Sequence, residues 1–276
     1  MPDSRGKLGI LAGGGKLPAQ LVAACKESGR DLFVLAFKGE TDPETVAGVD
    51  HAWIRLGAAG TGFELLRRAG CRELVLAGPV KRLSPVSLRP DWRTLQFFAK
   101  IGRRAWGDDG LLSAVISELE SEGFRVIGAE AILPSLLAPL GSLGRIAAEP
   151  AHLADIERGV EVLRELGRLD IGQAAVVQQG VVLGLEAVEG TDLLIERCAK
   201  LMREGRGAVL VKIKKPGQET RVDLPTVGER TVRRAAAGGF SGIAVEAGGT
   251  IVLGKEAAVD AANRLGLFLQ GVAVER

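Results

Sequence analysis

The sequence predicts an α/β protein of two domains, an N-terminal parallel-sheet domain and a C-terminal α+β domain. Its 276 residues suffice for one large or two modest domains, and 46% hydrophobic with 25% charged residues is an ordinary globular balance. The core must be aliphatic, because the chain has eight Phe, three Trp and no Tyr. Short aliphatic runs that alternate with segments of helical spacing are typical of buried parallel strands joined by helices.

In the first half of the chain, apolar runs of strand length alternate with helical segments. We expect strands at 8–12, 32–37, 52–56, 73–77 and 124–127, and helices at 17–28, 62–69, 91–105 and 111–122. Repeated strand–helix–strand units of this length predict parallel strands with right-handed crossovers. Residues 1–131 are therefore expected to form a Rossmann-like domain.

The second half has a different pattern of expected strands and helices. Residues 132–150 are rich in Pro and Gly and are expected to be a linker. After it, a hairpin is expected at 174–188 with Gln179-Gly180 at its turn. Further strands are expected at 208–212, 222–224, 241–245 and 250–253, and helices at 153–166, 191–202, 229–237 and 256–265. This mixture predicts an α+β domain over residues 151–276.

Charge, cysteine and histidine content argue against several classes of protein. Lys and Arg total 36 against 34 Asp and Glu, a net charge of +2, so nucleic acid is not an expected partner. The three Cys form no C-x-x-C pair, and two isolated His do not suggest a zinc hydrolase or a serine triad. Residues 1–7 are polar and no uncharged run reaches about 18 residues, so we expect a cytoplasmic protein without a transmembrane helix.

A glycine run, GILAGGGKLP at 9–18, follows the first expected strand and opens a helix. Backbone amides at such a turn, the helix dipole and Lys16 suit an anionic phosphate. The run is not a Walker A loop, because no Ser or Thr follows Lys16. It is an imperfect dinucleotide fingerprint, because Pro18 replaces the third glycine. We favour a nucleotide-phosphate site, and a tight turn that binds nothing stays open as the alternative.

Acidic residues and lysines recur in the C-terminal half. They are Glu186, Glu189, Asp192, Lys212, Lys214, Lys215 and Asp223. Carboxylates that hold Mg²⁺, together with lysines that neutralise a diphosphate, are what phosphoryl chemistry requires. Helix capping by Glu189 and Asp192, and a solvated edge at the lysines, are the structural alternatives.

A basic stretch with aromatic residues follows the fourth expected strand. Residues 81–104 hold seven Lys or Arg against a single acid, and two of the three Trp lie in this stretch or just beyond it. Such a composition indicates a membrane-surface helix, a nucleic-acid patch or a core helix with a basic face. Because the net charge is low, we favour lipid over nucleic acid.

Six segments in this order resemble one enzyme family. They are GILAGGGKLP at 9–18, GDDGLL at 107–112, QQGVVLGLE at 178–186, EGTD at 189–192, VKIKKP at 211–216 and RVDLPTVG at 221–228. The combination is similar to the UDP-2,3-diacylglucosamine pyrophosphatases of the LpxI type, enzymes of lipid A biosynthesis in Gram-negative bacteria. The similarity spans nearly the full length.

The resemblance implies a UDP-binding N-terminal domain and a C-terminal domain that binds the acylated sugar. It implies hydrolysis that depends on Mg²⁺, or Mn²⁺, and gives UMP and 2,3-diacylglucosamine 1-phosphate (lipid X), with water attacking the glucosamine-side phosphorus. Asp223 matches the family's essential aspartate, as metal ligand or as the base that positions the water. Glu186, Glu189 and Asp192 are further candidate metal ligands.

The resemblance also implies the residues that contact UDP-2,3-diacylglucosamine. These are Ala12, Gly13, Gly14, Gly15, Lys16, Gly78, Gln178, Thr191, Lys212 and Thr226. The resemblance also leads us to expect a homodimer, whereas the composition of residues 81–106 leads us to expect transient contact with the inner membrane surface.

Two other functions remain open from the residues alone. One is an NADP-dependent oxidoreductase that uses the same glycine run with Lys38 near the cofactor phosphate. The other is a nucleotide-sugar sensor that binds its ligand without turnover.

Overall fold

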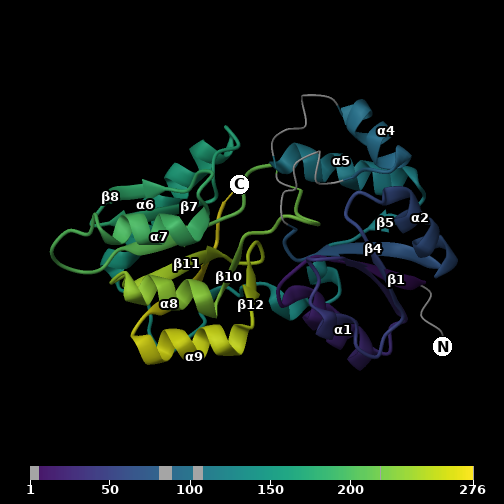
Figure 1. Cartoon of the computed structure of the whole chain (residues 1–276). Helices are drawn as coiled ribbons and strands as arrows, with labels where there is room; N and C mark the ends of the chain where they lie inside the picture. Colours follow the sequence, from purple (N-terminus) through teal and green to yellow (C-terminus); the bar gives the residue numbers. More distant parts are fainter. Residues whose placement is uncertain (1–5, 81–88, 102–107, 218, 276) are drawn as a thin grey trace. The chain divides into compact units, whose positions relative to one another are not determined.

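The computed structural model describes residues 6–80, 89–101, 108–217 and 219–275 (Figure 1). The chain divides into two compact units. Unit 1 comprises Met1–Pro134 with Glu219–Asp223, and unit 2 comprises Ser135–Gln218 with Leu224–Arg276. The predicted α/β class with two domains is confirmed, and each unit is described by itself.

Unit 1 is built on a five-stranded sheet of order β3-β2-β1-β4-β5, in which every pair is parallel. Its strands are β1 (Lys7–Ala12), β2 (Leu32–Phe37), β3 (His51–Ile54), β4 (Cys71–Ala77) and β5 (Arg125–Val126). Its α-helices are α1 (Leu17–Ser28), α2 (Ala59–Arg68), α4 (Trp92–Ile101) and α5 (Asp108–Ser121). Figure 1 shows α1 on one face of the sheet and α2 and α5 on the other. The predicted parallel sheet is therefore confirmed.

Unit 2 is built on a six-stranded sheet of order β6-β13-β11-β9-β7-β8 and a small parallel pair, β10 and β12. The strands are β6 (Gly141–Ser142), β7 (Ala174–Gln178), β8 (Val181–Leu185), β9 (Val209–Lys212), β10 (Thr226–Gly228), β11 (Gly242–Glu246), β12 (Ile251–Leu253) and β13 (Phe268–Val272). Strands β9, β11 and β13 are parallel, whereas β6, β7 and β8 pair antiparallel. The mixed sheet includes the predicted hairpin, β7–β8.

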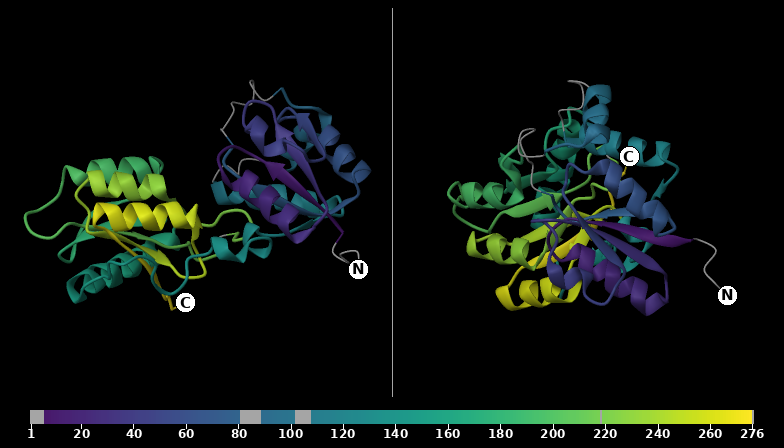
Figure 2. Two further views of the ribbon diagram at one scale, coloured as in Figure 1. Left: turned by 90° about the horizontal axis from the view of Figure 1, so that it is seen from below. Right: turned by 45° about the vertical axis from the view of Figure 1, so that its right-hand side comes forward.

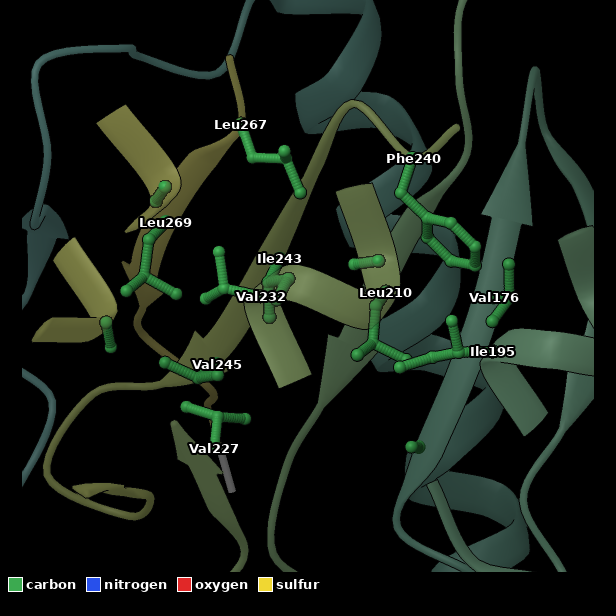
Figure 3. Packing of buried hydrophobic residues seen from close by; sticks show 14 of the residues in the cluster. Val176, Ile195, Leu210, Val227, Val232, Phe240, Ile243, Val245, Leu267 and Leu269 are labelled. Atoms are coloured by element: carbon green, nitrogen blue, oxygen red, sulfur yellow. The ribbon is translucent and has the colours of Figure 1, made fainter. Parts of the chain in front are cut away.

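Helices cover both faces of the unit 2 sheet. They are α6 (Pro150–Gly167), α7 (Gly190–Ala199), α8 (Glu229–Ala237) and α9 (Lys255–Leu265). Helix α6 covers one face and α7, α8 and α9 cover the other (Figure 2, left). Figure 3 shows the larger core, where Ile195 and Val232 from the helices meet Leu210, Ile243 and Val245 from the sheet.

The segment expected as a linker, 132–150, carries structure of its own. The backbone of Ala138 donates to Thr250 O (2.9 Å), and β6 pairs with β13. The Pro and Gly residues there bend an edge segment onto the sheet, and contacts place everything from Ser135 onward in unit 2. Composition alone does not distinguish a tight edge segment from a mobile linker.

Residues 222–224, expected to be a strand of the C-terminal domain, form no strand, so that prediction is wrong. Val222 packs against the apolar core of unit 1. Arg221 binds two carboxylates of the same unit, Glu120 on α5 (2.6 Å) and Glu219 (2.7 Å). These contacts fasten 219–223 to unit 1, although the sequence on either side belongs to unit 2.

Asp91 caps two helices of unit 1. Its Oδ1 accepts from the amide and hydroxyl of Thr94 in α4 (both 2.8 Å), and its Oδ2 accepts from the amide of Gly60 in α2 (2.8 Å). Burial by itself would raise the pKa of Asp91, but the hydrogen bonds from Thr94, Gly60 and Thr61 outweigh it and lower that pKa. The carboxylate therefore joins the starts of α2 and α4.

We expect Asp91→Ala to lower the free energy of unfolding by about 2 kcal/mol, because both helix starts lose their cap. The folded pKa is depressed, so the stabilisation is complete above the ordinary value of about 4 and is lost as the pH falls through the folded value. Urea unfolding at pH 7 and pH 3 checks both points, with exposed Asp50→Ala as control. A difference between wild type and variant that is as large at pH 3 as at pH 7 contradicts this assignment.

Candidate active site

The glycine loop lies where the strand order of unit 1 reverses. Strand β1 is central, with β2 on one side and β4 on the other. Loops that leave the carboxyl ends of two such neighbouring strands diverge, and ligands of open parallel sheets bind in the crevice between them. The loop after β1 carries Gly13, Gly14 and Gly15, and the loop after β4 carries Gly78.

Those two loops pack backbone against backbone. Gly13 N donates to Ala77 O and Gly14 N to Pro79 O, each at 2.8 Å. A Cβ on Gly13 would lie 2.6 Å from the carbonyl oxygens of both Gly78 and Pro79. Gly78 itself has φ +85°, a left-handed conformation that suits glycine. Glycine is thus required at both positions for the loops to approach.

This packing limits which amides can bind a phosphate. The N–H groups of Gly13 and Gly14 already have acceptors, so they serve the loop. Gly15 and Lys16 are exposed, and the first amides of α1 have no acceptor within the helix. Ala12 is buried in β1, and its carbonyl accepts from the Thr41 hydroxyl. The anion site that the sequence predicts therefore narrows to Gly15, Lys16 and the start of α1.

A buried polar network lies at the carboxyl end of β9 in unit 2. Lys212 Nζ donates to Thr191 Oγ1 (2.7 Å), and that hydroxyl donates to Glu186 Oε1 (2.6 Å). Lys212 is 5% exposed and Glu186 7%. Thr226 adds its carbonyl oxygen at 3.4 Å from Lys212 Nζ. The fold thus brings together four residues that the sequence predicts separately.

Sheet topology explains this meeting. Lys212 ends β9, and its partner in the antiparallel ladder is Ala174 at the start of β7. Glu186 follows β8 and donates its amide to Ala174 O (2.8 Å). Thr191 lies in the first turn of α7, which begins just after that strand. Antiparallel pairing therefore places the ends of β8 and β9 at the same edge of the sheet.

Gln178 lies at the opposite edge, because it ends β7 whereas Lys212 pairs with the start of that strand. Its Nε2 donates to the carbonyls of Arg203 (2.8 Å) and Arg206 (2.7 Å), and its Oε1 accepts from Arg203 N (2.8 Å). The buried amide therefore holds the loop before β9. Its role as a substrate contact stays a prediction.

The candidate metal ligands Glu189 and Asp192 are each paired with arginine. Glu189 binds Arg197 (2.7 Å), and this hydrogen bond lowers the pKa of Glu189. Asp192 lies 3.3 Å from Arg230 and 3.5 Å from Arg234 on α8. These pairs position the loop before α7 and join α7 to α8, and the role of Glu189 and Asp192 as metal ligands stays a prediction.

Asp223 is half-buried in unit 1, where its amide donates to Glu219 O (3.1 Å). It is the last residue of the unit 1 segment before the chain passes into unit 2 at Leu224. Among the residues that the structure describes, no three His, Cys, Asp or Glu side chains form a group that could hold a metal ion. The Mg²⁺ site stays a prediction.

An ion pair between Glu246 and Lys214, which the sequence did not predict, lies at the carboxyl ends of the strands of unit 2. Glu246 ends β11, and its two oxygens accept from Lys214, Oε1 from Nζ (3.3 Å) and Oε2 from the backbone amide (3.0 Å). An acid that ends a buried run in AVEAGG, just before two glycines, was the available signal. The two contacts of Glu246 with Lys214 fix the course of the chain directly after Lys212.

The basic stretch is described only in part. Residues 81–88 and 102–107 lie outside the described residues, as does the first residue of the GDDGLL motif. Helix α4 and the start of α5 are described. Within the part of the chain that the structure covers, no helix has both the length and the apolar composition needed to cross a membrane.

These features define a two-domain α/β protein with a glycine-lined loop in one unit and a buried lysine network in the other, and comparison with known families agrees. The LpxI N-terminal domain model matches residues 7–136, and the LpxI C-terminal domain model matches residues 139–270. The chain therefore belongs to the LpxI family. It is 44% identical over 275 residues to UDP-2,3-diacylglucosamine pyrophosphatase LpxI of Caulobacter vibrioides, covering 96% of this chain and 97% of that one.

Two solved structures resemble the chain distantly. N5-carboxyaminoimidazole synthase from Aspergillus clavatus, bound to ADP and 5-aminoimidazole ribonucleotide, is 17% identical with a TM-score of 0.25, over 73% of this chain and 45% of that one. The biotin carboxylase domain of Hydrogenobacter thermophilus 2-oxoglutarate carboxylase, bound to ADP, is 14% identical with a TM-score of 0.28. That match covers 72% of this chain and 42% of the other. TM-scores this low do not establish a shared fold.

Proposed function

We propose that this chain hydrolyses the diphosphate of UDP-2,3-diacylglucosamine in lipid A biosynthesis, giving UMP and 2,3-diacylglucosamine 1-phosphate. The observation that carries the proposal is the 44% identity over nearly the whole length of a protein named UDP-2,3-diacylglucosamine pyrophosphatase LpxI. The glycine loop and the Lys212 network support it, because a diphosphate needs backbone donors and buried cations. The enzyme is a hydrolase of a phosphoric anhydride.

In this proposal the two units bind different parts of the substrate. Gly15, Lys16 and the start of α1 bind the UDP side through backbone amides and one ammonium group. Lys212, oriented by Thr191, neutralises charge that builds up on the reacting phosphoryl group. Asp223 is the candidate base that holds the attacking water and accepts its proton.

We include Mg²⁺, or Mn²⁺, as the cofactor, and Asp223 in unit 1 and Glu186 in unit 2 are each a separate candidate ligand. Glu186 accepts hydrogen bonds from Thr191 and from the amide of Gln173, and a carboxylate offers about four acceptor positions, so it retains capacity. When bound, such an ion would neutralise charge on the diphosphate. A homodimer and a cytoplasmic location at the inner membrane surface belong to the same proposal.

Hydrolysis in ¹⁸O-water tests the reaction and the point of attack. We expect the label in 2,3-diacylglucosamine 1-phosphate, and loss of turnover in EDTA that added Mg²⁺ restores. Label in UMP would keep the hydrolase but place attack on the other phosphorus. Binding of the nucleotide sugar without any turnover by the wild type would reject the proposal and favour a sensor.

A further inference from the structure

The large apolar side chains that unit 1 exposes are concentrated on one helix. Trp92, Leu95 and Phe98 of α4 are 72%, 47% and 42% exposed, and Val80 completes the set among the described residues of unit 1. Spacing of three residues places all three on one face of the helix. Scattered exposed apolar residues are normal, but a contiguous patch marks an interaction surface.

Other side chains of α4 attach the helix to unit 1. Thr94 is buried, and its hydroxyl donates to Gly57 O (2.8 Å). Arg93 pairs with Glu122 and lies over the ring of Phe63, 5.9 Å from its centroid. The helix is therefore held through Arg93 and Thr94, while the side chains of Trp92, Leu95 and Phe98 stay exposed.

The charge around this face is basic. Among the described residues 89–101, Arg89 and Lys100 carry exposed positive charge, Arg93 is paired with Glu122, and Asp91 is the one acid. Asp91 is engaged in capping α2 and α4. Lys100 bonds Glu118 on α5 while its own side chain is 70% exposed. An apolar stripe with a basic border is the composition of a helix that lies at an anionic bilayer surface, where Trp is favoured.

We propose that the Trp92–Leu95–Phe98 face of α4 docks unit 1 on an anionic phospholipid bilayer, inserting these side chains between the headgroups. The inference rests on the proposed function, because a substrate with two acyl chains resides in a bilayer. Docking keeps the enzyme where its substrate is concentrated. A second copy of the chain is the competing occupant.

Vesicle co-sedimentation with phosphatidylglycerol and phosphatidylcholine in equal amounts tests the docking face. We expect the wild type to bind and Trp92→Gln/Leu95→Gln/Phe98→Gln to bind at least about tenfold more weakly, because three inserted apolar groups are lost. The matched control is Leu140→Gln/Leu201→Gln/Leu265→Gln, three exposed leucines of unit 2. It should bind like the wild type, and both variants should keep their unfolding temperature.

Three outcomes would overturn the proposal: no vesicle binding by the wild type, equal binding by the α4 variant, or a dimer that only the α4 variant fails to form. Hydrolysis of substrate dispersed in detergent micelles separates this proposal from the proposed function. The α4 variant should retain that activity, since none of its three side chains belongs to the proposed site. If the wild type does not hydrolyse the substrate in micelles, the proposed hydrolase function is wrong. The vesicle experiment still decides whether α4 docks on the bilayer.

Discussion

Asp223→Asn is expected to lower kcat about a thousandfold while the protein stays folded. The amide is nearly isosteric with the carboxylate, but it neither accepts the proton of the attacking water nor carries the charge that would hold a cation. The backbone contact of residue 223 with Glu219 O does not depend on the side chain. We therefore expect an unchanged unfolding temperature and retained binding of UMP.

Steady-state kinetics with detergent-dispersed substrate, together with UMP titration, measures this effect. Asp50→Asn is the matched control, because Asp50 is an exposed acid of the same unit that pairs with Lys7. It should remain within about twofold of the wild type. Activity of Asp223→Asn within tenfold of the wild type would remove Asp223 from the chemistry.

The surroundings of Asp223 support its precise placement. Arg221 is held by Glu219 and Glu120, and its hydrogen bond lowers the pKa of Glu219, so the pair is ionised at neutral pH. Val222 packs into the apolar core of unit 1. Contacts on both preceding residues thus fix the backbone at the point where the chain leaves unit 1 for unit 2.

Local signals predicted the individual elements well. The bounds expected for α1, 17–28, agree with the structure because Pro18 suits a first turn and Gly29, with φ +67°, ends the helix. The run LFVLAF predicted β2 as 32–37, since only a buried central strand is apolar throughout. In each case the determining residues lie within the element or next to it.

Long-range relations escaped prediction. Strand β6 has two residues and exists only through its pairing with β13, so no local pattern reveals it. Residues 222–224 look like a strand, yet Val222 packs against a core whose buried residues lie between Phe33 and Val126 in the sequence.

For the site, sequence order could not decide which edge of the sheet each residue occupies. Gln178 and Lys212 both end strands and both belong to family-like motifs, but antiparallel pairing of β7 and β9 separates them. The sequence predicted Glu189 and Asp192 as metal ligands but did not reveal their arginine partners, which lie on a later turn of α7 and on α8. Residue type and spacing thus indicated candidate site residues, but they did not reveal which residues would contact them in the fold.

Lys212→Met is expected to lower kcat/KM by about a hundredfold to a thousandfold and the free energy of unfolding by about 3 kcal/mol. The activity falls because a buried ammonium group no longer faces the diphosphate. The stability falls because Glu186, linked to Lys212 through the Thr191 hydroxyl, keeps a buried charge without its cation. Urea unfolding and steady-state kinetics measure the two losses separately.

The double variant Lys212→Met/Glu186→Gln separates the two roles. Removing the carboxylate charge as well should restore most of the stability, because Gln still accepts from Thr191 and no uncompensated charge remains. It should not restore activity, since the cation is still missing. Glu186→Gln alone shows how much activity the carboxylate contributes. If the double variant regains both stability and activity, Lys212 serves only to neutralise Glu186 within the fold, and the cation that faces the diphosphate must be sought elsewhere.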